Sequence, residues 1–146
     1  MRKILASLLL GCIFLSCEKK DPKEQLKHLS GYWEIDKVEF SNDSVKEYTM
    51  SPYIDYLEFN NDKGFRRKVK PKFDGTSIAA GTTEEIEAIV ENDSLRLYYK
   101  TPYAIWMETV ISAEEDKMRI LNPEGVIYHY NKYQPINIST NEEAEQ

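Results

Sequence analysis

Two histidines, two cysteines and several acidic runs are the side chains that could do chemistry in this 146-residue sequence. His28 and His129 are isolated, and neither has the His-x-x-x-His spacing of a zinc site. There is no Gly-x-Ser-x-Gly motif, no glycine-rich phosphate loop and no Asp-x-Asp-x-Asp calcium loop. We interpret the acidic runs at 84–87 and 114–116 as a strand edge and a turn. The sequence therefore predicts a protein that is not an enzyme and that holds neither a metal nor another cofactor.

Both cysteines lie in the first seventeen residues, Cys12 within an apolar segment and Cys17 just after it. Arg2 and Lys3 precede an apolar run from Ile4 to Leu15. This run is shorter than the roughly 20 residues that a membrane-spanning helix needs, so it is typical of an export signal. Residues 14–17, Phe-Leu-Ser-Cys, resemble the lipobox of bacterial lipoproteins, in which the cysteine receives the lipid.

Two cysteines compete for this role, because residues 9–12 also fit the lipobox pattern. We prefer Cys17, since cleavage before Cys12 leaves a short apolar run and puts residues 13–15 at the lipidated end. The competing interpretation is an ordinary signal peptide with an incidental cysteine. Lipidation of Cys17 would leave no cysteine pair for a disulfide or a metal.

The lipobox resemblance implies a division of the chain. Residues 1–16 are the predicted signal peptide, 17–25 a tether, 26–134 the folded domain and 135–146 an acidic flexible tail. A palmitate-bearing Cys17 would hold the protein in the envelope of a Gram-negative bacterium. Glu18 follows the cysteine, and an Asp there would resemble an inner-membrane retention signal. We therefore expect the outer membrane.

Charge and length restrict the classes of partner. The chain has a formal net charge of −6, and loss of Arg2 and Lys3 with the signal makes it more acidic. An acidic domain repels nucleic acid and anionic surfaces. The basic run at 63–72 is the exception, and we interpret it as a solvated hairpin strand. The folded part is long enough for one domain with a core.

Short alternating segments separated by turn residues predict an all-β fold. A helical turn at 24–29 ends at Ser30-Gly31, and no long helical pattern follows, which excludes parallel crossovers. About eight antiparallel strands in sequence would expose two edges unless the sheet closes. We therefore predict an up-and-down eight-stranded antiparallel barrel with a short N-terminal helix, and a two-sheet sandwich is the alternative. The expected strands are 32–40, 54–59, 65–69, 83–91, 95–100, 103–112, 117–121 and 126–133.

The entry to the first strand supports the barrel. Gly31-Tyr32-Trp33, after a short helix, resembles the Gly-x-Trp signature of the lipocalins, in which the tryptophan plugs the closed end of the barrel. The resemblance covers about residues 26–133. Lipocalins typically pack an arginine near the last strand over this tryptophan. Here that strand offers Lys132, and the strand before it offers Arg119.

Strand alternation gives a set of side chains that could line the barrel. Arg67 shares a face with Phe65 and Val69, so it is a buried cation that needs a carboxylate or an anionic ligand if that face is internal. A bulge at Gly64 would instead turn Arg67 to solvent, because a one-residue shift reverses every inward assignment. The candidate ligand-binding residues are Phe59, Phe65, Arg67, Tyr99, Met107 and Tyr128.

The predicted fold and the predicted location in the cell envelope suggest two functions. The first is a non-enzymatic envelope lipoprotein that binds a small apolar or amphipathic ligand in its barrel. The alternative is an interaction module that docks another envelope protein, with a filled barrel core. An open, aromatic-lined pocket favours the first, and an exposed apolar patch favours the second.

Overall fold

The computed structural model describes residues 20–134 of the chain. The predicted signal peptide, Cys12, Cys17 and the tail at 135–146 lie outside the described residues. Helix α1 (Pro22–His28) starts within the predicted tether, with Asp21 as its N-cap and Pro22 at its start. The strands are β1 (Gly31–Glu39), β2 (Val45–Glu47), β3 (Ile54–Asn60), β4 (Lys63–Pro71), β5 (Ser77–Glu91), β6 (Ser94–Lys100), β7 (Ile105–Ala113), β8 (Lys117–Leu121) and β9 (Ile127–Lys132).

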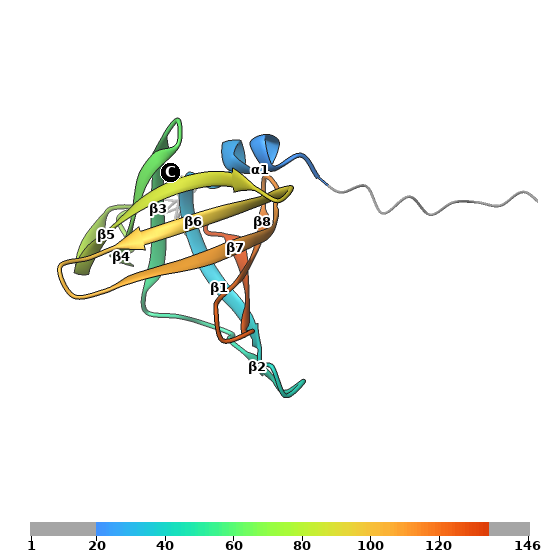
Figure 1. The fold of residues 1–146 in the computed structure, drawn as a ribbon. Helices are drawn as coiled ribbons and strands as arrows, with labels where there is room; N and C mark the ends of the chain where they lie inside the picture. Colours follow the sequence, from blue (N-terminus) through green and yellow to red (C-terminus); the bar gives the residue numbers. More distant parts are fainter. Residues whose placement is uncertain (1–19, 135–146) are drawn as a thin grey trace, which may run out of the picture.

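Eight of these strands form a closed antiparallel barrel. β1 pairs with β3, β3 to β9 pair in sequence order, and β9 pairs back with β1. The three-residue strand β2 pairs with the second half of β1 alone. Figure 1 shows the barrel with α1 beside one end. The structure confirms the predicted eight-stranded barrel and adds the short strand β2, which was not among the expected strands.

Tight turns set the register of the hairpins. Asn92 and Asp93 both have positive φ, as a two-residue type I′ turn requires, and they join β5 to β6. Asn61, also at positive φ, lies in the two-residue turn between β3 and β4. The register of β3 and β4 runs without interruption from Asn60↔Lys63 to Ile54↔Val69. This continuity decides which β4 side chains enter the barrel.

The two ends of the barrel differ because hairpin turns alternate between them. The helix α1 contacts β5, β6 and β7 and covers one end, which also holds the β3–β4, β5–β6 and β7–β8 turns. We call this the closed end. The β4–β5, β6–β7 and β8–β9 turns and the β1–β3 connection lie at the other end, which we call the open end.

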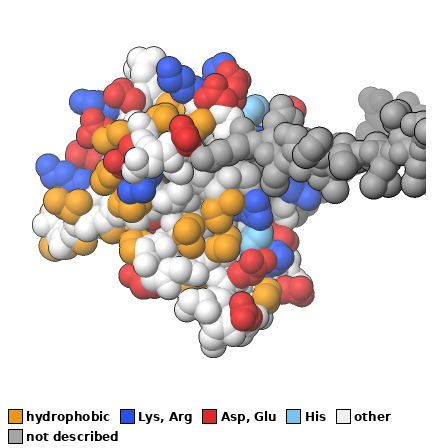
Figure 2. All heavy atoms as spheres, turned by 45° about the vertical axis from the view of Figure 1, so that its right-hand side comes forward, with side chains coloured by type: hydrophobic (Ala, Val, Ile, Leu, Met, Phe, Trp, Pro, Cys, Tyr) orange, Lys and Arg blue, Asp and Glu red, His pale blue; other side chains and the backbone are white. Residues whose placement is uncertain are grey.

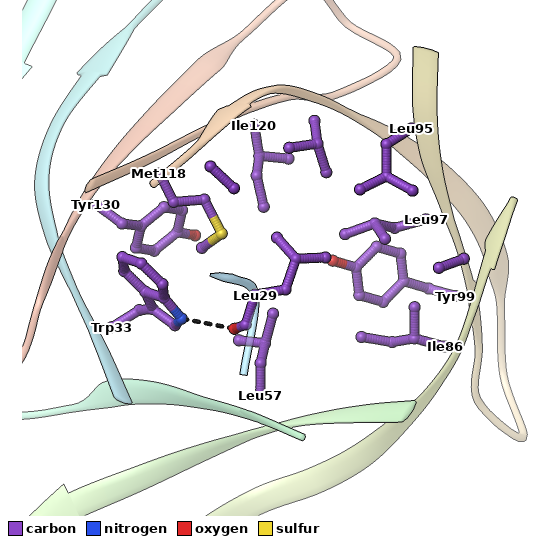
Figure 3. Packing of buried hydrophobic residues seen from close by; sticks show 13 residues of the cluster. Leu29, Trp33, Leu57, Ile86, Leu95, Leu97, Tyr99, Met118, Ile120 and Tyr130 are labelled. Carbon is purple, nitrogen blue, oxygen red and sulfur yellow. Dashed lines mark hydrogen bonds between the residues drawn. The ribbon is translucent and has the colours of Figure 1, made fainter. Parts of the chain in front are cut away.

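Trp33 plugs the closed end and is fully buried. Its Nε1 donates a hydrogen bond to the Leu29 carbonyl oxygen at 2.8 Å, which ties the end of α1 to the barrel (Figure 3). The apolar cluster around it draws on most strands. Its buried members are Leu29, Trp33, Leu57, Ile86, Ala88, Leu95, Leu97, Tyr99, Val110, Ala113, Met118, Ile120 and Tyr130.

Lys132 takes the place of the arginine that the lipocalin resemblance implies. Its Nζ lies 4.2 Å from the centre of the Trp33 ring and donates to the Ser30 carbonyl oxygen at 2.6 Å. Gly31 has a φ of 131°, and a Cβ on it would come within 2.5 Å of the Lys132 Nζ. Gly31, Trp33 and Lys132 therefore form one packed unit. Arg119 instead donates from Nε to the Ser112 hydroxyl on the outer surface.

The outer surface carries mixed charges. On the face in Figure 2, hydrophobic side chains lie in small groups among acidic and basic ones. Among residues 20–134, no helix is long and apolar enough to cross a membrane.

Candidate functional site

The inner face of β4 carries charged side chains. Leu57 belongs to the apolar cluster inside the barrel, and its partner across the β3–β4 ladder is Arg66. Directly opposed residues point to the same face of a sheet, so Arg66 points inward. Lys68, two residues further along, lies opposite the buried Asp55 on the same face. The interior thus carries apolar and charged side chains together on β3 and β4, and the charged pairs extend toward the open end through Lys68.

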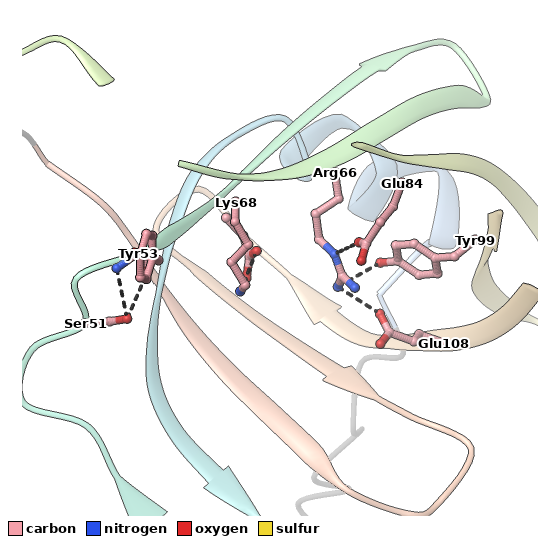
Figure 4. A network of polar contacts seen from close by, with 8 residues as sticks. Ser51, Tyr53, Arg66, Lys68, Glu84, Tyr99 and Glu108 are labelled. Carbon is pink, nitrogen blue, oxygen red and sulfur yellow. Dashed lines mark hydrogen bonds and ion pairs between the residues drawn. The ribbon is translucent and has the colours of Figure 1, made fainter. Parts of the chain in front are cut away.

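Arg66 joins four neighbouring strands through its guanidinium. Its Nε donates to Glu84 Oε2 on β5 at 2.5 Å, and its Nη1 lies 3.3 Å from Glu108 Oε2 on β7 (Figure 4). The same Nη1 lies 3.4 Å from the Tyr99 hydroxyl on β6. We call Arg66, Glu84, Glu108, Asp55 and Lys68 the interior charge network.

Aromatic rings stack beside this network. The Arg66 guanidinium carbon is 4.4 Å from the centre of the Tyr99 ring, within cation–π distance. The Tyr99 ring stacks on Trp106 of β7, with centroids 5.0 Å apart and an interplanar angle of 1°. Trp106 and Tyr128 are partly buried and pack against the apolar cluster. A wall of rings therefore leads from the core toward the open end.

Lys68 and Asp55 form the third ion pair of the network. The Lys68 Nζ lies 2.7 Å and 2.9 Å from the two Asp55 carboxylate oxygens. The Asp55 side chain is 5% exposed, whereas that of Lys68 is 58% exposed. Because Lys68 faces inward, its exposure shows that solvent reaches the interior from this half of the barrel.

Burial and neighbouring charges set the protonation of the network. Burial raises the pKa of the Glu108 carboxyl, although Arg66 opposes this effect. Burial lowers the pKa of Arg66, but Tyr99 and Glu108 outweigh it, and the net shift is upward. Burial also raises the pKa of the Tyr99 and Tyr130 hydroxyls. Arg66 is therefore a permanent cation, and Glu108 is the network carboxyl whose protonation burial favours.

The network offers charged hydrogen-bonding groups, and none of its members is a serine, cysteine or histidine. Among residues 20–134, no cluster of His, Cys, Asp and Glu could hold a metal ion. What this arrangement can do chemically is to hold the polar part of a molecule whose apolar part lies against Trp106 and Tyr128.

Three of the six predicted ligand-binding residues point into the barrel. Phe59 and Tyr128 pack against the apolar cluster, and Tyr99 is one of its members. The inward prediction is wrong for Phe65, which opposes the outward-facing Glu58 and packs edge-on against Tyr56.

Arg67 and Met107 also point outward, against the prediction that they line the barrel. The Arg67 guanidinium lies 5.6 Å from the Phe65 ring centre on the outer surface, and β3 and β4 stay in register without a bulge at Gly64. Met107 opposes Tyr98 on the outer face of β6 and β7. The inward face of β4 and of β7 was assigned wrongly because both strands carry apolar residues on the outer face. The alternate, inward-facing positions are occupied by Arg66 on β4 and Glu108 on β7.

The interior charge network was missed because the inward faces of β4 and β7 were assigned from their apolar residues, which selected the opposite face of each strand. A signal for it exists in the β3–β4 hairpin. A two-residue turn at 61–62 pairs Asn60 with Lys63, which places Arg66 opposite Leu57. Counting from that turn would have assigned Arg66, rather than Arg67, to the interior.

A hollow of about 640 Å³ lies over the outer surface of β7, β8, β9 and β1. Asp36 and Ile111, at the irregularities of β1 and β7, are part of its lining, together with Arg119 and His129. The His129 Nε2 lies 3.0 Å from Glu39 Oε1, and the Lys37 Nζ lies 2.8 Å from the same oxygen. These groups lie on the outside of the barrel, away from the interior charge network.

Comparison with known proteins gives the family. The model of the lipocalin-like domain family matches residues 29–120. The chain is similar to a lipocalin-like protein from Bacteroides uniformis ATCC 8492, with 12% identity and a TM-score of 0.46, over 73% of this chain and 99% of the other. No match to a curated protein was found. The family model spans most of the barrel, and the chain belongs to the lipocalin-like domain family.

Proposed function

We propose that the protein is a non-enzymatic lipoprotein of the cell envelope whose barrel binds a small amphipathic molecule through its open end. A lipid on Cys17 would hold it in the outer membrane. The polar group of the ligand would meet the interior charge network, and its apolar part would lie against Trp106 and Tyr128. The single observation that carries this proposal is an inward-facing, partly exposed charge network beside a wall of aromatic rings.

The energetics support a functional role for the network. Charged groups inside a protein cost several kcal/mol each in lost hydration, and well-packed apolar residues are often as stable or more stable. The barrel nevertheless places Arg66, Glu108 and Asp55 inside, with little exposure. A site that must hold a polar group accounts for this cost.

Native mass spectrometry of protein purified from its own membrane tests the ligand. We expect a bound small molecule that dissociates on unfolding, together with a reduced amount in Trp106→Ala. The control is Tyr98→Ala, which removes an aromatic ring from the outer face. Repeated recovery of an empty barrel, with the membrane extracted gently, would contradict ligand binding.

Radiolabelled palmitate tests the anchor separately. We expect incorporation that is lost in Cys17→Ala and kept in Cys12→Ala. Labelling that persists in Cys17→Ala and disappears in Cys12→Ala would move the lipid to Cys12. Absence of label from the wild-type protein would leave a secreted barrel and contradict the anchor.

A second candidate function, docking of an envelope protein, is favoured by a row of rings on the outside of the barrel. The ring centroids of Tyr32 on β1 and Tyr56 on β3 are 4.6 Å apart, and those of Tyr56 and Phe65 on β4 are 5.8 Å apart. Tyrosine and arginine are enriched among residues that dominate protein interfaces, and Arg67 ends this row. A photo-crosslinking residue at position 32 should capture a discrete partner, whereas one at position 98, also on the outer surface, should not.

A further inference from the structure

The charges on β4 point to the chemistry of the ligand. We infer that the molecule held by the barrel carries one anionic group, which docks against a row of cations formed by Arg66, Lys68 and Lys70 on the inner face of β4. This inference rests on the proposed function and adds the sign of the charge to it.

The row follows from the geometry of the strand. Alternate residues of a strand point to one face, and Arg66 and Lys68 point inward through their contacts with Glu108 and Asp55. Lys70 continues this face, and it pairs with Ile78 of β5 beyond the last β3–β4 pair. The three cations therefore run from the middle of the barrel to the open end.

The row keeps unused donors. Arg66 uses Nε and Nη1 for Glu84, Tyr99 and Glu108, and its Nη2 has no partner among residues 20–134. Lys70 is exposed and makes no hydrogen bond or ion pair within the part of the chain that the structure describes. An incoming anion therefore meets a free guanidinium nitrogen at the inner end and a free ammonium at the outer end.

The negative charge of the network carboxylates equals the positive charge of this row. Three cations on β4 face Asp55, Glu84 and Glu108, so the six groups sum to zero when all are ionised. Burial raises the pKa of Glu108, and Arg66, Tyr99, Glu84, Asp55 and Tyr130 interact with it electrostatically from five strands. Uptake of a proton by Glu108 would make the site positive and compensate an anionic ligand. An organic cation would instead meet Lys70, the cation of the row that has no carboxylate partner among residues 20–134.

A matched series of twelve-carbon amphiphiles tests the sign. Isothermal titration calorimetry below the micelle concentration compares dodecanoate, dodecyl phosphate, dodecanol and dodecyltrimethylammonium on the full-length protein. We expect either anion to bind about tenfold or more tightly than dodecanol, because charge-assisted hydrogen bonds are stronger than neutral ones, and the ammonium to bind most weakly. A preference between carboxylate and phosphate then separates a fatty-acid source from a phosphate-bearing one.

Variants on the exposed end of the row avoid unfolding. Lys70→Gln should weaken binding of the anion about threefold, and Lys68→Gln with Lys70→Gln about tenfold, with dodecanol unchanged. Lys63→Gln, on the same strand at the closed end, is the control and should bind as the wild type does. At pH values where dodecanoate is itself fully ionised, its affinity should also fall as the pH rises further, and Glu108→Gln should remove that dependence.

The outcomes separate the two proposals. Dodecanol binding as tightly as dodecanoate, or an unchanged affinity in the Lys68→Gln, Lys70→Gln double variant, overturns the anionic ligand but leaves a ligand-binding barrel. Tightest binding of the ammonium also overturns it. If none of the four amphiphiles binds, the proposed function fails, and the inference fails with it.

Discussion

The two ends of the barrel solve opposite problems. At the closed end, Trp33 and Leu29 are fully buried, and the turns between strands are built from Asn, Asp and Glu. At the open end, the interior carries ion pairs, and the turns expose large apolar side chains such as Phe73 and Tyr103, at 81% and 90% exposure. The closed end follows the rule of apolar inside and polar outside, whereas the open end departs from it, with ion pairs beside the interior aromatic rings and apolar side chains on its turns.

The two ends of the barrel therefore contribute differently to the stability of the fold and to binding. Apolar burial at the closed end stabilises the fold, at roughly 25 cal/mol for each Å² removed from water. The open end contributes less to that term and instead offers charges and rings to a partner. We therefore expect the loss of an apolar side chain to destabilise the fold more at the closed end than at the open end, and mutations of the interior charges to change binding and pH dependence as well as stability.

The largest expected effect comes from the two tryptophans. Trp33→Ala should lower the free energy of unfolding by about 3–5 kcal/mol, because a fully buried ring leaves a cavity and the Leu29 carbonyl loses its donor. Trp106→Ala, at the open end, should cost less than half as much, since its ring is partly exposed. Urea unfolding followed by circular dichroism measures both. Equal losses would contradict the division between the two ends.

Two adjacent arginines give the next comparison. Arg66→Met should lower the free energy of unfolding by about 2–4 kcal/mol, because it leaves the Glu84 and Glu108 carboxylates without their cation. Arg67→Met, on the outer face, should change it by less than about 0.5 kcal/mol. Urea midpoints of both variants and the wild type decide the matter. A larger loss for Arg67→Met would mean that β4 is turned the other way.

The fold could be predicted from the sequence because its signals are local and agree with one another. Turn residues at 61–62 and 92–93, the alternation at 95–99 and the Gly31-Tyr32-Trp33 entry all point to one barrel, and the structure has it. The strand expected at 83–91 begins earlier in the structure, at Ser77, because pairing of β5 with β4 outweighs the low strand propensity of Gly81. Tertiary pairing cannot be seen in local propensity.

The candidate site could be predicted only in part. Tyr99 and Tyr128 follow the usual rule for interiors, and their inward direction was predicted correctly. Arg66 and Glu108 break that rule, because the cost of burying each charge is offset by the other across two strands that are not adjacent in the sheet. Such a pairing depends on closure of the barrel. The sequence shows neither the closure nor the distance between the strands.

The pH dependence of stability should distinguish the open end from the closed end. Burial raises the pKa of Glu108 in the folded protein, so the folded state holds a proton that the unfolded chain releases. The free energy of unfolding should therefore fall as the pH rises through the window above the usual glutamate value of about 4.3. Urea midpoints across this window should slope less in Glu108→Gln than in the wild type. Glu114→Gln, at an exposed position, is the control. If the urea midpoint changes with pH equally in Glu114→Gln and Glu108→Gln, Glu108 is not the cause of the pH dependence of stability.

The smallest expected effect concerns the cation at the closed end. Lys132→Ala should lower the free energy of unfolding by about 1 kcal/mol, because the Trp33 ring loses its cation and the Ser30 carbonyl oxygen loses a donor. Lys132→Arg should keep most of this stability, since a guanidinium stacks on an indole and also donates to a carbonyl. Lys117→Ala, on the exposed start of β8, is the control and should lie within about 0.5 kcal/mol of the wild type. If Lys132→Ala unfolds at the same urea concentration as Lys117→Ala, then Trp33 and Leu29 alone close this end, and the cation over the indole adds nothing to it.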